Sequence, residues 1–278
     1  MTDTSDDGIA SLGPFETLLT KRRDAILIVS LNRPSALNSL SATMVRELTD
    51  LFTQLHQRPD IRVVILRAEG RAFCAGADLT SWELSADGEG RVHRGLAVQR
   101  SIATIMQLMR SCPQPIIALA QGPACGGGFS LLLSSDVRYA APSLRMNAAY
   151  IRIGLSGCDM GSSYLLPRLV GMSLASELLL TGRFIHADRA AAVGLVSGVV
   201  PEEDLLQTGL EIAEEMLSTN PLGLRLTKDG LNWAIDAPSM GAAMAMEDRQ
   251  QILVSGTHDA TEAVNAFFEK RPPVYRDL

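Results

Sequence analysis

The chain lacks a long apolar run and has no excess of basic charge. No uninterrupted apolar stretch approaches the ~20 residues of a membrane span. Residues 1–14 are acidic and polar, unlike a signal peptide. The net charge of −6 argues against a nucleic-acid surface, which needs clustered Lys and Arg. We therefore expect a cytoplasmic protein with no membrane contact and no nucleic-acid partner.

Cysteine is scarce, and its spacing disfavours two common uses of the residue. The four cysteines, Cys74, Cys112, Cys125 and Cys158, form no C-x-x-C pair and lie in apolar or glycine-rich surroundings. Neither a disulfide framework nor a zinc site is typical of this arrangement. We expect four free thiols and no metal site.

The chain does contain enough apolar material for a large core. Hydrophobic residues make up 46% of its 278 positions, which suits one large domain or a domain with an appended subdomain. We expect a flexible tail at 1–14, a core domain at 15–200 and a helical region at 201–278, where the pattern becomes almost wholly helical.

Strand-like and helix-like segments alternate along the predicted core. Ala25–Leu31 is a short apolar run rich in β-branched residues, and apolar residues recur every three or four positions after Ser41, a suitable helix N-cap. This alternation indicates an α/β fold. Further strands are predicted at 62–66 and 115–120, and further helices at 96–109 and from the glycine triplet through 133.

Two short runs of small residues, 73–79 and 122–128, each follow a predicted strand. Residues without bulky side chains let the main chain approach a ligand closely, and N–H groups at a tight turn or helix start stabilise a carbonyl oxygen as negative charge develops on it. Together the two runs are typical of an oxyanion hole.

These loops resemble those of the crotonase superfamily, the enoyl-CoA hydratase/isomerase enzymes. The resemblance implies an α/β spiral of β-β-α repeats with the active site between successive turns. It also implies a C-terminal helical region that assembles a homotrimer or a dimer of trimers. By the same resemblance, the backbone N–H groups of Ala77 and Gly127 bind the acyl thioester oxygen. Further motifs in the family's order lie at 31–34, 36–38, 180–183, 194–196 and 267–271.

The resemblance also implies contacts to coenzyme A. Arg33, Leu37, Cys74 and Ala75 would line the pantetheine and adenine sites, and Lys270 would approach the nucleotide phosphates. Alternatively, Lys270 and its basic neighbour form a solvated charge pair. Coenzyme A enters as part of an acyl-CoA substrate, so we expect no separate cofactor.

The sequence departs from the family at its acid/base positions. Hydratases carry two glutamates that hold and activate water, whereas Ser130 and Tyr150 occupy those positions here. A hydroxyl and a phenol of pKa about 10 are poor bases at neutral pH, and loss of one positioned acid/base group typically costs about 10²- to 10⁴-fold in rate. We therefore expect little hydration. The simplest alternative is that Ser130 and Tyr150 only line the site, although Tyr150 could also donate a hydrogen bond.

One carboxylate remains in this region. In the dienoyl-CoA isomerase branch of the family, an aspartate near the position of Asp159 acts as a base, although Asp159 lies one residue further along. Alternatively, Asp159 caps the helix predicted to start around Ser162. Asp78, in the first loop, is expected to be structural.

Residues 84–95 are glycine-rich, charged and without periodicity, which predicts a loop directly after the first oxyanion turn. His93 has a side chain suited to proton transfer. A solvent-exposed loop histidine is the alternative interpretation.

A single base suits double-bond migration better than hydration, because the same carboxylate can remove a proton and return it at another carbon. We therefore expect an isomerase acting on an enoyl- or dienoyl-CoA in fatty-acid or related catabolism, with Asp159 as base. The alternatives are an acyl-CoA hydrolase or hydratase of the same family, or a catalytically silent acyl-CoA-binding protein.

Overall fold

The computed structural model describes residues 12–80 and 90–277. The tail predicted at 1–14 falls almost entirely outside these residues, as does the first half of the loop predicted at 84–95. Among the helices within the described ranges, none is long and apolar enough to cross a membrane.

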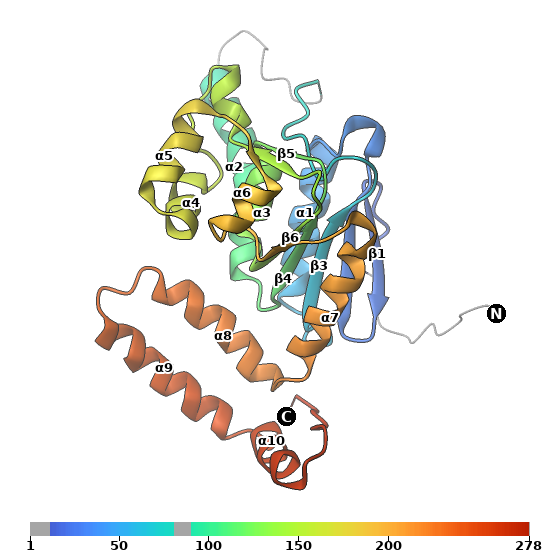
Figure 1. Ribbon diagram of the computed structural model, residues 1–278, viewed down its shortest axis with the longest axis vertical. Coiled ribbons are helices and arrows are strands. Elements are labelled where there is room, and N and C mark those ends of the chain that lie inside the picture. Colours follow the sequence, from blue (N-terminus) through green and yellow to red (C-terminus); the bar gives the residue numbers. More distant parts are fainter. Residues whose placement is uncertain (1–11, 81–89, 278) are drawn as a thin grey trace, which may run out of the picture.

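The main sheet is parallel except at one edge (Figure 1). Its strand order is β1-β2-β3-β4-β6-β9, and only β1 runs antiparallel to its neighbour. All residues of β2 and β4 are buried, as expected for a parallel sheet covered on both faces. The strands are β1 (Leu18–Arg23), β2 (Ile26–Leu31), β3 (Val63–Ala68), β4 (Ile116–Ala120), β6 (Val137–Ala140) and β9 (Gly198–Val199).

The predicted strands at 25–31, 62–66 and 115–120 are confirmed as β2, β3 and β4. The sequence analysis missed β1. Five of the six residues of β1 are exposed, and three of them, Lys21 to Arg23, are basic. Charge on an edge strand discourages pairing with another chain, and it also hides the apolar signal by which strands are recognised.

Alternate residues of the central strands face two different cores. Leu27 and Val29 pack into the larger core with α1 (Ala42–Leu55), α2 (Arg91–Ser111) and α3 (Gly127–Ser134). Ile26 and Ile28 face a smaller core that α7 (Leu205–Leu217) covers. Since successive side chains on a strand point to opposite faces, both faces need a helical cover. The first helix of the predicted C-terminal region therefore packs directly on the sheet.

The predicted start of α1 is confirmed, whereas α2 starts earlier than predicted. Ser41 caps α1 as predicted, its hydroxyl accepting a hydrogen bond from the Met44 N–H at 3.2 Å. The loop predicted at 84–95 is wrong from Arg91 onward, because α2 starts there after Gly90 in a left-handed conformation. The first turns of α2 are largely exposed, so they carry no apolar periodicity to signal a helix.

A second, smaller sheet and several short helices complete the spiral. The sheet has the order β5-β7-β8, with β5 (Pro123–Cys125) leading into α3. Its other strands are β7 (Arg145–Asn147) and β8 (Ile185–His186). The 3₁₀ helices are η1 (Pro34–Ala36), η2 (Ala149–Ile153) and η3 (Glu202–Asp204), and the remaining α-helices are α4 (Ser162–Val170), α5 (Met172–Thr181) and α6 (Ala187–Ala192).

The last three helices extend away from the body of the protomer (Figure 1). They are α8 (Pro221–Ala234), α9 (Met240–Ser255) and α10 (His258–Glu269). Large apolar side chains on them are well exposed, among them Ile252 at 74%, Phe267 at 78% and Phe268 at 76%. Apolar surface on this scale typically marks a protein–protein contact.

We expect these helices to assemble a homotrimer or a dimer of trimers. Multi-angle light scattering at micromolar concentration should give three or six times the chain mass, and replacing Phe267 and Phe268 together by Glu should lower that mass. Thr20→Glu, on exposed β1, is the matched control and should leave the mass unchanged. A wild-type monomer at that concentration would contradict the expected assembly.

Candidate active site

The two predicted oxyanion loops lie against each other. The Cys74 N–H donates to Pro123 O at 3.1 Å, and the Cys125 N–H donates to Cys74 O at 2.9 Å. Gly76 adopts φ 99, and a Cβ at that position would lie 2.9 Å from Cys125 O. A Cβ on Gly128 would lie 2.2 Å from Cys74 O. The glycines are therefore required by the close approach of two backbones.

Each loop contains a backbone N–H group that makes no hydrogen bond to another described residue. Leu40 pairs with the first loop by donating to Gly76 O at 2.8 Å and accepting from the Asp78 N–H at 3.1 Å, which leaves the Ala77 N–H between them. Gly127 is the first residue of α3, where an N–H has no intrahelical acceptor. Within residues 12–80 and 90–277, neither N–H has a hydrogen-bond partner. Both N–H groups can therefore donate hydrogen bonds to a ligand oxygen, and their role as an oxyanion hole stays a prediction.

The first loop is braced by an ion pair. An Nη2 of Arg33 lies 2.9 Å from Asp78 Oδ2, and its Nη1 donates to Ser39 O at 2.6 Å. A hydrogen bond from Thr80, together with Arg33, lowers the pKa of Asp78. Asp78 is therefore structural, as predicted, and the guanidinium of Arg33 already holds the turn.

Of the other residues predicted to contact coenzyme A, three lie at the first loop and the turn before it, and Lys270 lies far from them. Ala75 donates to Leu37 O at 3.0 Å, so these two residues join the turn to the loop. Cys74 is fully buried, and burial raises the pKa of its thiol to about 12. Lys270 caps the end of α10, which lies far below β5 in Figure 1. One chain therefore does not bring Lys270 to the loops, and its predicted contact would need a neighbouring copy.

Ser130 and Tyr150 lie beside the oxyanion loops and are almost completely buried, at 0% and 4% exposure. A Cβ on Gly126 would lie 3.6 Å from Tyr150 Cδ1. The Ser130 and Tyr150 hydroxyl oxygens have no hydrogen-bond partner among the described residues. Burial raises the pKa of Tyr150 to about 12. Neither side chain can accept a proton readily at neutral pH.

Asp159 is half-buried, and its carboxylate accepts a hydrogen bond from the Gln99 side chain on α2. It does not cap α4 through that carboxylate. The N-cap residue is Gly161, without a side-chain bond, and the Asp159 main chain contacts Ser162 instead, its N–H donating to Ser162 Oγ at 3.1 Å. The capping interpretation is therefore wrong, and the carboxylate is directed toward α2.

Met160 follows Asp159 and contacts the second of the two loops. Its Sδ lies 3.7 Å from the position that a Cβ on Gly127 would take. Met160 adopts φ 44 and Gly161 adopts φ 80, so the chain makes a left-handed turn directly after Asp159. A non-glycine residue in this region costs on the order of 1–3 kcal/mol, and such strain is typical of functional sites. The residue that follows Asp159 therefore contacts the start of α3, where the Gly127 N–H lies.

Burial is the main reason why the pKa of Asp159 is raised, against the opposing hydrogen bonds of the Met160 N–H and Gln99. His93, whose side chain also suits proton transfer, lies in the exposed first turn of α2, and its exposure agrees with the interpretation of a solvated histidine. Sequence reasoning missed Gln99 and Met160. Neither side chain titrates, and only the fold brings them to the carboxylate.

A carboxyl group whose folded pKa is raised destabilises the folded state when it is ionised, and this penalty disappears on protonation. We therefore expect Asp159→Asn to raise the thermal unfolding midpoint at about pH 7 and to change it less at about pH 3. Differential scanning calorimetry across this range measures the difference. A midpoint change independent of pH would contradict the effect of burial.

Asp60 offers a control of opposite sign. A hydrogen bond from Arg58 is the main cause that lowers its pKa to about 2. The resulting stabilisation is present above the unfolded pKa and is lost as pH falls through the folded value. Asp60→Asn should therefore lower the midpoint at about pH 7, and the difference should shrink as the pH approaches about 2.

Known proteins are similar to this chain in sequence and in fold. The chain matches the enoyl-CoA hydratase/isomerase family over residues 21–278. It is 38% identical over 263 residues to the probable enoyl-CoA hydratase EchA12 of Mycobacterium tuberculosis, covering 94% of this chain and 92% of that protein. It is 31% identical over 261 residues to the 1,2-epoxyphenylacetyl-CoA isomerase of Escherichia coli, with coverages of 94% and 98%.

A solved structure has a similar fold. The crystal structure of enoyl-CoA hydratase from Bacillus anthracis superposes with a TM-score of 0.88 at 35% identity, covering 95% of this chain and 100% of that one. The match extends over the sheet, both loops and the C-terminal helices, so the chain belongs to the enoyl-CoA hydratase/isomerase family, the crotonase superfamily.

Proposed function

We propose that the protein isomerises a double bond in an enoyl- or dienoyl-CoA, with Asp159 as the base. The observation that supports this proposal is the half-buried carboxylate of Asp159, whose next residue, Met160, contacts the position of Gly127 at the unpaired N–H groups of the two loops. No second carboxylate is available at the positions of Ser130 and Tyr150.

The reaction divides between the two parts of the site. The Ala77 and Gly127 N–H groups hold the thioester oxygen and stabilise the negative charge that develops when a proton leaves the alpha or gamma carbon. Asp159 takes that proton and returns it at the other carbon, which moves the double bond. A raised pKa makes Asp159 a stronger base and so favours removal of the proton, because the protonated carboxyl is then less costly to form.

The names of the relatives support both an isomerase and a hydratase. One is called a probable hydratase and another an isomerase of an epoxidised acyl-CoA. The buried hydroxyls of Ser130 and Tyr150 weigh against hydration, because neither activates water as a carboxylate does. An acyl-CoA hydrolase would also fit one carboxylate, and a silent acyl-CoA-binding protein would need none.

The base is tested by Asp159→Asn. This change keeps the shape of the side chain and the oxygen that accepts from Gln99, but it removes the proton acceptor. We expect isomerisation of a 3-enoyl- or dienoyl-CoA, followed by absorbance, to fall about 10²-fold or more, while binding of the CoA ester stays within a few-fold.

Proton exchange at the alpha carbon gives an independent reading of the same step. It should fall in parallel with isomerisation in Asp159→Asn and remain in His93→Asn, the matched control at an exposed histidine. Turnover unchanged by Asp159→Asn on an active substrate would remove Asp159 from the mechanism.

A hydration assay distinguishes an isomerase from a hydratase. Wild-type protein should hydrate crotonyl-CoA slowly or not at all, and the double replacement Ser130→Glu with Tyr150→Glu should increase the rate in any variant that folds. A wild-type hydration rate of about 10² s⁻¹ or above, which lies within the usual enzyme range, would refute the proposed absence of hydratase chemistry.

A further inference from the structure

One face of α2 leads away from the proposed base. Gln99, which bonds Asp159, is followed on the same helix face by Ala103, Met106 and Arg110. At 1.5 Å per residue, Arg110 lies about 16 Å along the helix from Gln99. The helix therefore provides a path of fixed length that starts at the residue bonded to the proposed base.

A cavity of about 860 Å³ lies along this path between α2, α4 and α8. Its wall includes Met160 and Gly161, the two residues directly after Asp159, as well as Ala103, Met106 and Leu165. The cavity thus begins next to the base, and its wall there is mainly apolar. Its volume falls in the range of roughly 300–1,000 Å³ that is typical of ligand pockets.

A polar link between α2 and α8 crosses the cavity at Arg110. Arg110 donates to the Asn232 side chain, and Asn232 Nδ2 donates to Arg110 O at 2.7 Å. Both residues line the cavity. Because the Arg110 and Asn232 groups in this link hydrogen-bond each other, they do not need a hydrogen-bonding group on a ligand. Leu222 and Leu226 on α8 line the cavity as well, so the cavity continues along α8 past the link.

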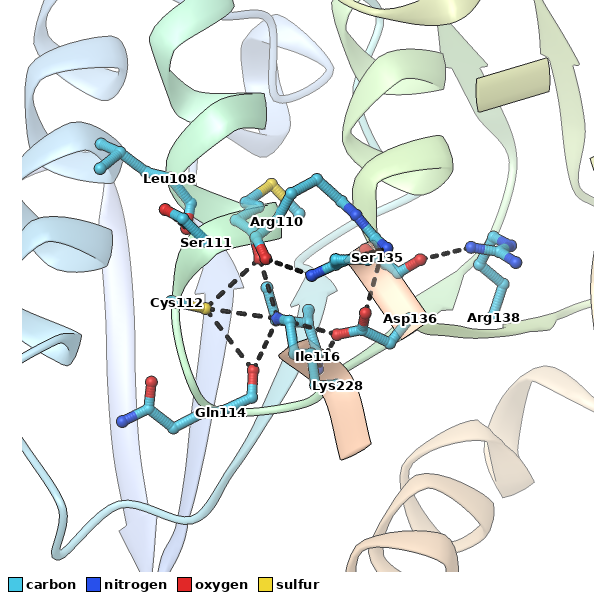
Figure 2. Close-up of polar contacts among 12 residues, drawn as sticks. Leu108, Arg110, Ser111, Cys112, Gln114, Ile116, Ser135, Asp136, Arg138 and Lys228 are labelled. Carbon is cyan, nitrogen blue, oxygen red and sulfur yellow. Dashed lines mark hydrogen bonds and ion pairs between the residues drawn. The ribbon is translucent and has the colours of Figure 1, made fainter. Parts of the chain in front are cut away.

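The cations around this link are all neutralised, as Figure 2 shows for two of them. Arg110 and the buried Lys228 both contact Asp136, at 2.9 and 3.0 Å. Lys228 also donates to Met109 O and Gln114 O. Arg225 forms a two-pronged pair with Asp277 at 2.7 Å. Among these groups no cation is left to receive a carboxylate at the far end of an acyl chain.

We infer that the cavity selects a long, uncharged acyl chain, of about a dozen carbons beyond the reacting atoms, that reaches the Arg110–Asn232 link. The length follows from the 16 Å path, since an extended chain advances roughly 3.8 Å in three bonds. This inference rests on the proposed function only in requiring an acyl-CoA ligand. Short acyl groups would leave the apolar wall at Ala103 and Met106 without a partner.

Binding of saturated thioesters tests the length preference without any reaction. Calorimetric titration should show tetradecanoyl-CoA, kept below its micelle concentration, binding at least about 30-fold more tightly than hexanoyl-CoA, because each buried methylene strengthens binding. Ala103→Trp fills the path and should reduce this ratio to within about threefold. Ser101→Trp, an equal change on the exposed face of α2, should preserve the wild-type ratio.

A second variant covers the case in which Ala103→Trp fails to fold. Ile235→Trp enters the cavity from the end of α8, where the native side chain is already 39% exposed. It should reduce the ratio in the same way. A wild-type ratio within threefold, or an undiminished ratio in the folded tryptophan variants, would overturn the inference. A normal ratio with no isomerase activity would refute the proposed function alone.

Discussion

The site depends on the contact between two stretches of backbone that leave no room for a side chain. The Cys74 and Cys125 main chains hydrogen-bond directly, and Gly128 packs onto the Cys74 carbonyl oxygen so closely that a methyl group would overlap it. This contact sets the distance between the Ala77 and Gly127 N–H groups. Preorganised donors of this kind can stabilise a developing negative charge only if their positions are fixed, and this contact fixes them.

The fold was predictable where local signals and burial agree. β2 and β4 are buried throughout and apolar except for Ser30, and α1 carries both a capping serine and an apolar stripe, so apolar runs and periodicity identified all three. β1 and the first turns of α2 escaped prediction because they face solvent. Their side chains show no buried period, and only pairing with β2 or the position of Gly90 defines them.

The sequence predicted which loops form the candidate site, but it did not predict the direction of the side chains around them. The glycine runs pointed to the N–H pair, and the missing glutamates at Ser130 and Tyr150 were visible in the sequence. The direction of Asp159 was not, because it depends on a strained turn at Met160 and on a hydrogen bond from Gln99, sixty residues away. The proline-poor, unremarkable sequence around Gln99 carries no signal of that partnership.

The buried ammonium of Lys228 has a consequence for how the chain unfolds. Its acceptors, Met109 O, Gln114 O and Asp136, all belong to the segments around β4, so one side chain fastens α8 to the centre of the protein. Amide protons of α8 should then exchange with solvent only in openings that also disturb β4. Those of α9 and α10 lack such an anchor among the described residues, so their protection reports instead on association with other copies.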